Sequence, residues 1–141
     1  MNKTEPIDAE TLLATPLPPV GWLIPGLLPA GLSLLAGASK AGKSWLCLWL
    51  CLQLAQGSEI WNRPTRPQTV LYLGLEDTLA RIQTRLFRLA GDVVPSRLYC
   101  QTQCGCIGEG LELQIEKFLF RHPETGLVVI DTLQKIRPAE T

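Results

Sequence analysis

Gly37 to Ser44 form a glycine-rich segment of the pattern Gly-x-x-x-x-Gly-Lys-Ser, and its surroundings leave few folds open. A short apolar run, 32–36, precedes the segment and predicts a buried strand. A longer run that is apolar nearly all round, 44–56, follows it and predicts a helix that is buried on a sheet and ends at Gly57. The sequence therefore predicts a strand, a tight loop and a helix in succession.

This pattern between a strand and a helix is typical of a P-loop, which binds the phosphates of a nucleoside triphosphate. Glycines let the loop curl so that backbone N–H groups converge on the phosphates, and the N-terminal end of the helix adds partial positive charge. We expect Lys43 to reach the β and γ phosphates as a catalytic group and Ser44 to ligate Mg²⁺. The residues expected to contact Mg-ATP are Gly37, Ala38, Ser39, Lys40, Ala41, Gly42, Lys43, Ser44 and Trp45. Two alternatives stay open, because a glycine-rich turn can bind nothing and Lys40 can be solvated.

The rest of the chain alternates between apolar runs and helical patterns. The runs 69–73, 97–100 and 127–130 predict strands without a polar face, as in sheets covered on both sides. Helices are predicted near 79–90, with Asp77 or Thr78 as N-cap and Gly91 as C-cap, and near 111–120. This alternation predicts an α/β fold with a mainly parallel sheet flanked by helices.

The N-terminal segment has a different composition. Residues 1–19 are polar and then proline-rich, which favours a tail of extended or irregular backbone over a helix. Residues 20–30 are expected to pack irregularly against the core through Trp22, Leu23 and Ile24. We therefore divide the chain into a tail, 1–19, and one domain, 20–141.

Carboxylates follow two of the predicted strands. Asp131 ends the most apolar run and is placed as a Walker B aspartate that holds Mg²⁺ through water; the alternative is an ordinary turn residue. Glu76 follows another run at the same edge of the sheet, where ligands gather in open α/β folds. We assign Glu76 the role of base or polariser for an attacking water, the alternative being that Glu76 and Asp77 only cap the next helix.

Bulk properties exclude several classes of protein. With 141 residues and 46% hydrophobic composition the chain is expected to fold as one globular domain, and a formal charge of zero gives no sign of an overall polyanionic partner. The odd number of cysteines, five, and the lack of a secretory leader predict free thiols in the cytoplasm. The uncharged stretch 20–38 is interrupted by Pro and Gly, so we expect no membrane helix. Cys100, Cys104 and Cys106 lack paired Cys-x-x-Cys units, which argues against zinc.

Two further groups of residues bear on contacts with other molecules. Arg81, Arg85 and Arg88 lie opposite the apolar stripe of their predicted helix and form either a solvated face or a contact to phosphates of DNA or of a neighbouring subunit. The four tryptophans do not lie among basic residues, as a base-stacking platform requires, and are interpreted as packing residues.

Taken together, four segments resemble a known family. They are WLIPGLL (22–28), GASKAGKS (37–44), VLYLGLED (70–77) and VVIDTL (128–133). Their order and content resemble the RepA-like AAA-25 group of RecA-fold P-loop ATPases, which includes replicative hexameric helicases of plasmids and related phage or mobile-element proteins. The resemblance implies ATP hydrolysis at the subunit interfaces of a homo-oligomeric ring, coupled to movement along single-stranded DNA. It implies the roles stated above for Lys43, Ser44, Glu76 and Asp131.

One departure from the family affects the expected sheet. RecA-like sheets place the strand that follows Walker B between the Walker B strand and the P-loop strand. The sequence ends at Thr141, shortly after Asp131, and no apolar run lies between them. We therefore expect a sheet that is incomplete at the C-terminal end, as in a fragment or in a chain completed by a partner.

Three hypotheses follow for the function. The first is an ATPase of the helicase or helicase-related type in DNA replication. The second is a nucleotide-dependent assembly or regulatory module without useful turnover. The third is a small-molecule kinase, because a phosphate loop does not identify the acceptor.

Overall fold

The centre of the molecule is a three-stranded parallel sheet in the order β4-β3-β5. The computed structural model describes residues 5–37 and 42–139. β3 (Thr69–Gly74) lies between β4 (Leu98–Gln101) and β5 (Thr125–Asp131), and both neighbours run parallel to it. The prediction of a parallel α/β sheet from these three apolar runs is therefore confirmed.

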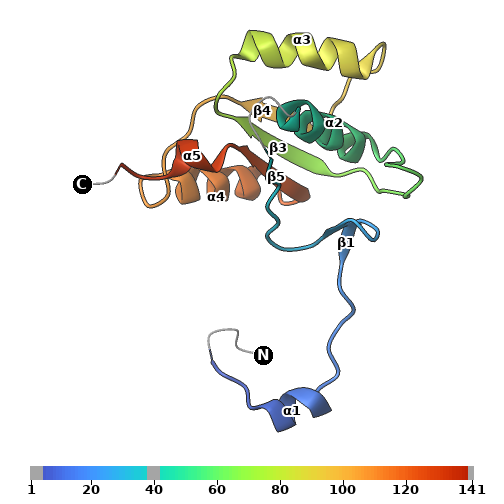
Figure 1. Ribbon diagram of the computed structural model, residues 1–141, viewed down its shortest axis with the longest axis vertical. Helices are drawn as coiled ribbons and strands as arrows, with labels where there is room; N and C mark the ends of the chain where they lie inside the picture. The colour runs from blue at the N-terminus through green and yellow to red at the C-terminus, as the bar shows by residue number, and fades with distance from the viewer. Residues whose placement is uncertain (1–4, 38–41, 140–141) are drawn as a thin grey trace.

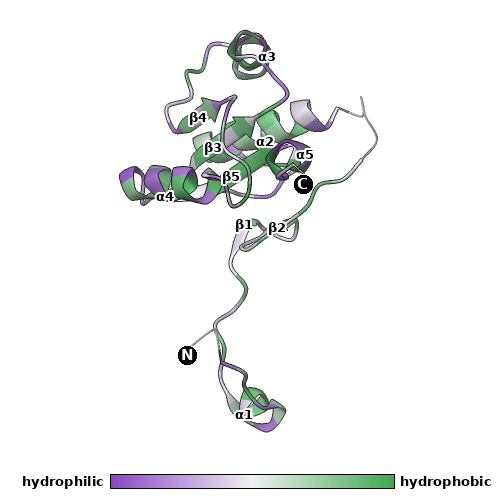
Figure 2. Cartoon of the chain, turned by 90° about the vertical axis from the view of Figure 1, so that its left-hand side faces the viewer, coloured by the Kyte–Doolittle hydropathy of each residue, from purple (hydrophilic) through white to green (hydrophobic). Residues whose placement is uncertain are grey.

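Helices cover both faces of the sheet. α2 (Lys43–Gln56) and α3 (Leu79–Ala90) lie on one face, and α4 (Leu111–Arg121) and α5 (Leu133–Ile136) on the other (Figure 1). All residues of β3 are buried, and they alternate between the faces. Val70 and Tyr72 pack in the cluster beneath α2, whereas Leu71 and Leu73 pack with Leu111 of α4. The hydrophobic character of β3 in Figure 2 follows from this two-sided burial.

The N-terminal segment projects away from these layers (Figure 1). It contains a short helix, α1 (Ala9–Ala14), so the prediction of a tail without helix was wrong. The side chain of Asp8 accepts a hydrogen bond from the backbone N–H of Thr11 at 2.9 Å and caps the helix. The prolines further along the chain lie beyond the end of α1 and therefore do not interrupt it.

A small hairpin connects this segment to the sheet layers. β1 (Trp22–Ile24) pairs antiparallel with β2 (Leu28–Pro29). Of the predicted anchors, Ile24 is completely buried against α2, but Trp22 remains 51% exposed. The expected packing of this region is therefore carried by Ile24.

The segment before the glycine-rich loop does not form the predicted strand. Residues 32–37 have no strand structure, and the side chains of Leu32 and Leu34 are exposed. A strand needs a neighbour for its backbone hydrogen bonds, and no strand follows β5 in the described part of the chain that could lie between β5 and this segment. The prediction of a strand at 32–36 was therefore wrong, because apolar composition does not supply a pairing partner.

The end of α2 gives a stability prediction. Gly57 closes the helix with a left-handed φ of 68°, and a Cβ atom at this position would lie 2.5 Å from Cδ of Pro67. We expect Gly57→Ala to lower the free energy of unfolding by about 3 kcal/mol, because backbone strain and a clash add up. In Gly108→Ala, where φ is 77° and no atom lies within 4 Å, only strain of about 1 kcal/mol is expected. Urea unfolding of both variants measures the difference, and equal losses would contradict the role of Pro67.

The cysteines and the helix lengths bear on two general expectations. All five cysteines are free thiols, as predicted. No helix within residues 5–37 and 42–139 combines the length and the apolar character that crossing a bilayer requires.

Candidate functional site

The predicted carboxylates meet at one edge of the sheet. Asp131 is the last residue of β5 and lies opposite Gly74, the last residue of β3. The backbone N–H of Leu75 donates to the carbonyl of Asp131 at 2.8 Å, which keeps the two strand ends together. Beyond this point the hydroxyl of Thr132 donates to Oε1 of Glu76 at 3.3 Å. The structure therefore brings Glu76 and Asp131 to the same carboxyl-end edge, where open α/β sheets bind ligands.

Asp131 is held by a residue that sequence reasoning did not select. Its side chain is only 8% exposed, and the Tyr72 hydroxyl donates to Oδ2 at 2.9 Å. Burial, followed by the negative charge of Asp131, raises the pKa of Tyr72 far above its usual range, so the hydroxyl stays protonated and remains a donor. Tyr72 is the only residue with a hydrogen-bonding side chain in the run 70–73, and this was the signal available in the sequence.

The beginning of α2 presents free backbone donors. Gly42 precedes the helix in a left-handed conformation, with φ of 83°, and no side chain of residues 5–37 or 42–139 caps the first turn. The N–H groups of that turn are therefore available to an anion. The ammonium of Lys43 donates to the carbonyl oxygen of Gly37, so the lysine side chain spans the loop from its last residues to its first. The loop residues predicted to contact phosphate at Ala38, Ser39, Lys40 and Ala41 lie outside the described residues.

Helix α2 also lies next to the end of β5. Cys47 is one turn after Lys43, and burial raises the pKa of its thiol. The negative charge of Asp131 raises this pKa further, whereas the positive charge of Lys43 lowers it. Both charges therefore act on the same thiol, in agreement with the packing of α2 against β5. Ser44, the predicted Mg²⁺ ligand, is half-buried in the same helical turn.

The match to known families decides how this geometry is interpreted. The family model AAA_25, described as an AAA domain, matches residues 3–141, which is nearly the whole chain. The chain belongs to the AAA_25 family. No solved structure gives a significant match. Membership confirms the resemblance found in the sequence and assigns a RecA-like P-loop fold and a nucleotide-binding function of the ATPase type to this AAA_25 domain.

Arg85 of α3 contacts both the loop that carries Asp77 and the first turn of α2. Its guanidinium forms an ion pair with Oδ2 of Asp77 at 2.6 Å and lies 5.4 Å from the ring centre of Trp45. The solvated-face interpretation is therefore wrong for Arg85, while Arg81 and Arg88 are exposed. Asp77 belongs to the loop directly before α3, and the packing of α2 beside α3 brings the Trp45 ring to the guanidinium. Trp45, predicted to contact the nucleotide, is 37% exposed and faces Arg85.

The contacts of Glu76 and Asp77 bear on the alternative that both only cap α3. The N-cap of α3 is Thr78, whose hydroxyl accepts from the N–H of Arg81 at 3.2 Å. Asp77 is paired with Arg85, and Glu76 accepts from Thr132. The carboxylate of Glu76 is therefore not used as the side-chain cap of α3 and lies exposed at the sheet edge.

The side chains present fit Mg-ATP. Asp131 is a buried carboxylate that forms no ion pair with any cation in the described residues, and the other side-chain oxygen in the predicted metal set is the Ser44 hydroxyl. Mg²⁺ prefers such oxygen ligands. Lys43 likewise forms no ion pair with a carboxylate of the described residues, so its charge is available to phosphate. Within the part of the chain that the structure describes, a helix start without a side-chain cap, a lysine without a carboxylate partner and a carboxylate without a cation partner together have the right chemistry for Mg-ATP.

Proposed function

We propose that the AAA_25 domain binds Mg-ATP at residues 37–45 and hydrolyses it. The observation that carries the proposal is the position of Glu76 and Asp131 at one end of the sheet, at the ends of strands against which α2 packs. Binding alone needs only the loop. A second carboxylate beside the metal-binding one is what hydrolysis requires, since an attacking water must be oriented and relieved of a proton.

Each residue has a separate role in this proposal. Lys43 leaves the carbonyl of Gly37 and binds the β and γ phosphates, while the N–H groups of the first turn of α2 donate to the same oxygens. Ser44 and Asp131 would hold Mg²⁺ through their side-chain oxygens. When bound, Mg²⁺ supplies positive charge that stabilises the phosphate oxygens in the transition state. Glu76 orients the attacking water, and the Thr132 hydroxyl fixes one of its carboxylate oxygens.

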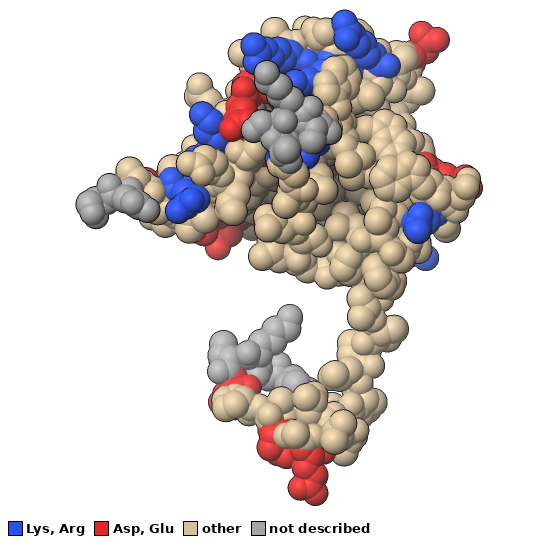
Figure 3. All heavy atoms as spheres, in the orientation of Figure 1, with Lys and Arg blue, Asp and Glu red and all other residues tan. Residues whose placement is uncertain are grey.

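We further place this ATPase among helicases or helicase-related replication proteins of plasmids, phages or mobile elements. This part rests on the family resemblance, which implies a homo-oligomeric ring acting on single-stranded DNA. Lys and Arg side chains gather on the surface over α3 (Figure 3), and Arg81 and Arg88 are exposed there. Such a basic strip can contact DNA phosphates. Free cysteine thiols fit a role in the reducing cytoplasm.

ATP turnover with and without single-stranded DNA tests the helicase assignment. We expect single-stranded DNA to increase phosphate release, and we expect this increase to disappear in the double variant Arg81→Ala/Arg88→Ala at moderate salt, because two phosphate contacts are lost. Arg121→Ala, at the end of α4, is the matched control and should respond to DNA like the wild type. Turnover that is unaffected by DNA in all proteins would remove the helicase part and leave the ATPase.

A nucleotide-dependent assembly module is the second candidate. It is favoured by the exposed apolar segment 32–36 and by the position of β5 at the edge of the sheet, since both features suit association with another chain. Tight ATP binding without phosphate release, together with sedimentation that changes when ATP is added, would favour this candidate over hydrolysis.

A further inference from the structure

Tyr72 reaches Asp131 by a specific route along the sheet. Tyr72 and Gly74 lie on the same face of β3, and Asp131 is the register partner of Gly74 on β5. A Cβ atom added to Gly74 would lie 2.7 Å from Cε1 of Tyr72, so the ring extends across the bare backbone of Gly74. The absence of a side chain at Gly74 thus opens the path by which the hydroxyl contacts the carboxylate of Asp131.

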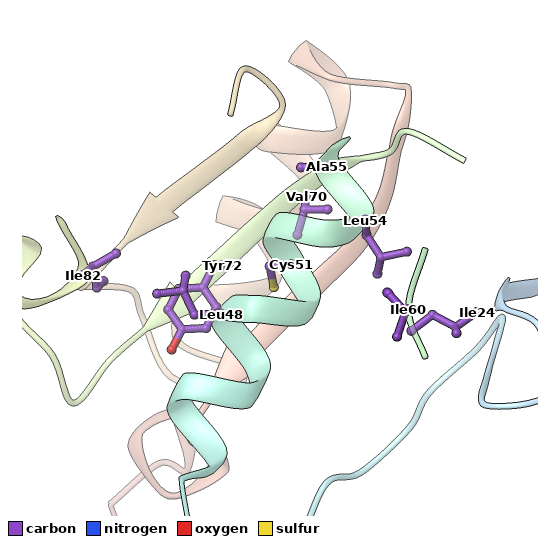
Figure 4. Close-up of a cluster of buried hydrophobic side chains, with 9 residues drawn as sticks. All are labelled: Ile24, Leu48, Cys51, Leu54, Ala55, Ile60, Val70, Tyr72 and Ile82. Carbon is purple, nitrogen blue, oxygen red and sulfur yellow. The ribbon is translucent and has the colours of Figure 1, made fainter. Parts of the chain in front are cut away.

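Packing holds the Tyr72 ring in place independently of its hydrogen bond to Asp131. Tyr72 is completely buried in the cluster beneath α2, together with Leu48, Cys51 and Ile82. Figure 4 shows the ring between β3 and α2, with its hydroxyl oxygen at the outer end beside Leu48. A ring packed in this way loses little further freedom when its hydroxyl forms a hydrogen bond. The hydroxyl is therefore a rigid donor, unlike one on a side chain in solvent.

The contact distinguishes the two oxygens of Asp131. Oδ2 accepts from the Tyr72 hydroxyl at 2.9 Å, and within residues 5–37 and 42–139 this is the hydrogen bond made by the Asp131 side chain. A carboxylate with one oxygen fixed cannot rotate freely about its terminal bond, so Oδ1 takes a defined position at the end of β5. Groups that hold a metal-binding carboxylate in this way commonly determine the affinity for the metal.

We infer that Tyr72 is a positioning residue for the Mg²⁺ site, and that its hydroxyl presents Oδ1 of Asp131 to the metal-bound water. The inference rests on the proposed Mg-ATP site. Tyr72 does not touch the nucleotide or the metal in this assignment. Its effect is therefore confined to metal-dependent binding and should be absent when ATP binds without metal.

The test compares nucleotide binding with and without metal in Tyr72→Phe, which keeps the packed ring and removes only the hydroxyl. Labelled ATP is titrated at increasing Mg²⁺, and separately in EDTA. We expect the Mg²⁺ concentration for half-maximal binding to rise about tenfold, while the affinity in EDTA stays unchanged. Tyr99→Phe is the matched control, because Tyr99 packs on Phe118 and His122 away from the site, and should match the wild type in both conditions.

Every outcome decides the inference. An unchanged Mg²⁺ requirement in Tyr72→Phe overturns it, and so does an equal loss of binding in Mg²⁺ and in EDTA, which would assign the hydroxyl to the loop or to the fold. In an Asp131→Ala background Tyr72→Phe should have no further effect, because its action passes through that carboxylate. If wild-type protein binds ATP equally with and without Mg²⁺, the proposed metal site fails as well; if only Tyr72→Phe shows no change, the metal site stands.

Discussion

Lys43→Ala is expected to weaken ATP binding about 100-fold, because it removes a charged hydrogen-bond donor worth about 3 kcal/mol to the phosphates. The lysine is poised for this role. It is the first residue of α2, its ammonium extends back to the carbonyl of Gly37, and it has no carboxylate partner in the described residues. Isothermal titration calorimetry with Mg-ATP measures the change.

The loss should be specific to this lysine. Lys117→Ala, on the exposed surface of α4, removes the same charge far from the loop and should leave the affinity for ATP unchanged. Lys43→Ala should also unfold at nearly the same urea concentration as the wild type, since the only contact of the ammonium in the described structure is to the carbonyl of Gly37. Wild-type affinity in a folded Lys43→Ala protein would remove the basis of the nucleotide site.

Glu76→Gln is expected to lower ATP turnover by about 100- to 10,000-fold while leaving ATP affinity within about twofold of the wild type. Glutamine keeps the size of the side chain and can still accept the hydrogen bond from Thr132. It cannot take a proton from water. The change therefore separates the chemical step from binding, and steady-state phosphate release measured beside calorimetry shows both.

Glu116→Gln is the control for this substitution. Glu116 lies exposed on α4, on the opposite face of the sheet from α2, and its loss of charge should not alter turnover. Hydrolysis at the wild-type rate in Glu76→Gln would assign Glu76 to another role and favour the assembly module. Tight ATP binding without turnover already in the wild type would lead to the same conclusion.

The pattern of apolar residues was sufficient to predict the helices and strands whose structure depends mainly on local sequence. Helix α2 was expected from 44 to 56 and begins only one residue earlier, because an apolar run ended by a glycine leaves little choice. The run that became β3 was found because a strand buried on both faces needs apolar residues at nearly every position. The runs of β4 and β5 also formed strands, but β4 exposes every second residue, so the expectation of cover on both faces was wrong for β4. Asp131 and Glu76 were found for a related reason, since polar residues directly after such strands lie at a common edge.

The sequence did not show which of these elements and side chains contact one another. Segment 32–36 has the composition of a strand, yet it is exposed, because strand formation depends on a partner that composition does not specify. Arg85 has the helical position of a solvated residue, yet it pairs with Asp77 of the preceding loop and lies over the Trp45 ring of α2. Tyr72 lies far from Asp131 in the chain and is joined to it only by the register of β3 and β5.

What the sequence by itself determined is therefore the set of chemical groups and the elements that carry them. The glycines, Lys43 and Ser44 of the loop, and the carboxylates of Glu76 and Asp131, are placed by local pattern, since strand ends and helix starts are encoded within a few residues. The tertiary structure alone decided that the Tyr72 hydroxyl holds one oxygen of Asp131. That hydrogen bond depends on strand register and on the bare backbone of Gly74, which are contacts between segments distant in the chain.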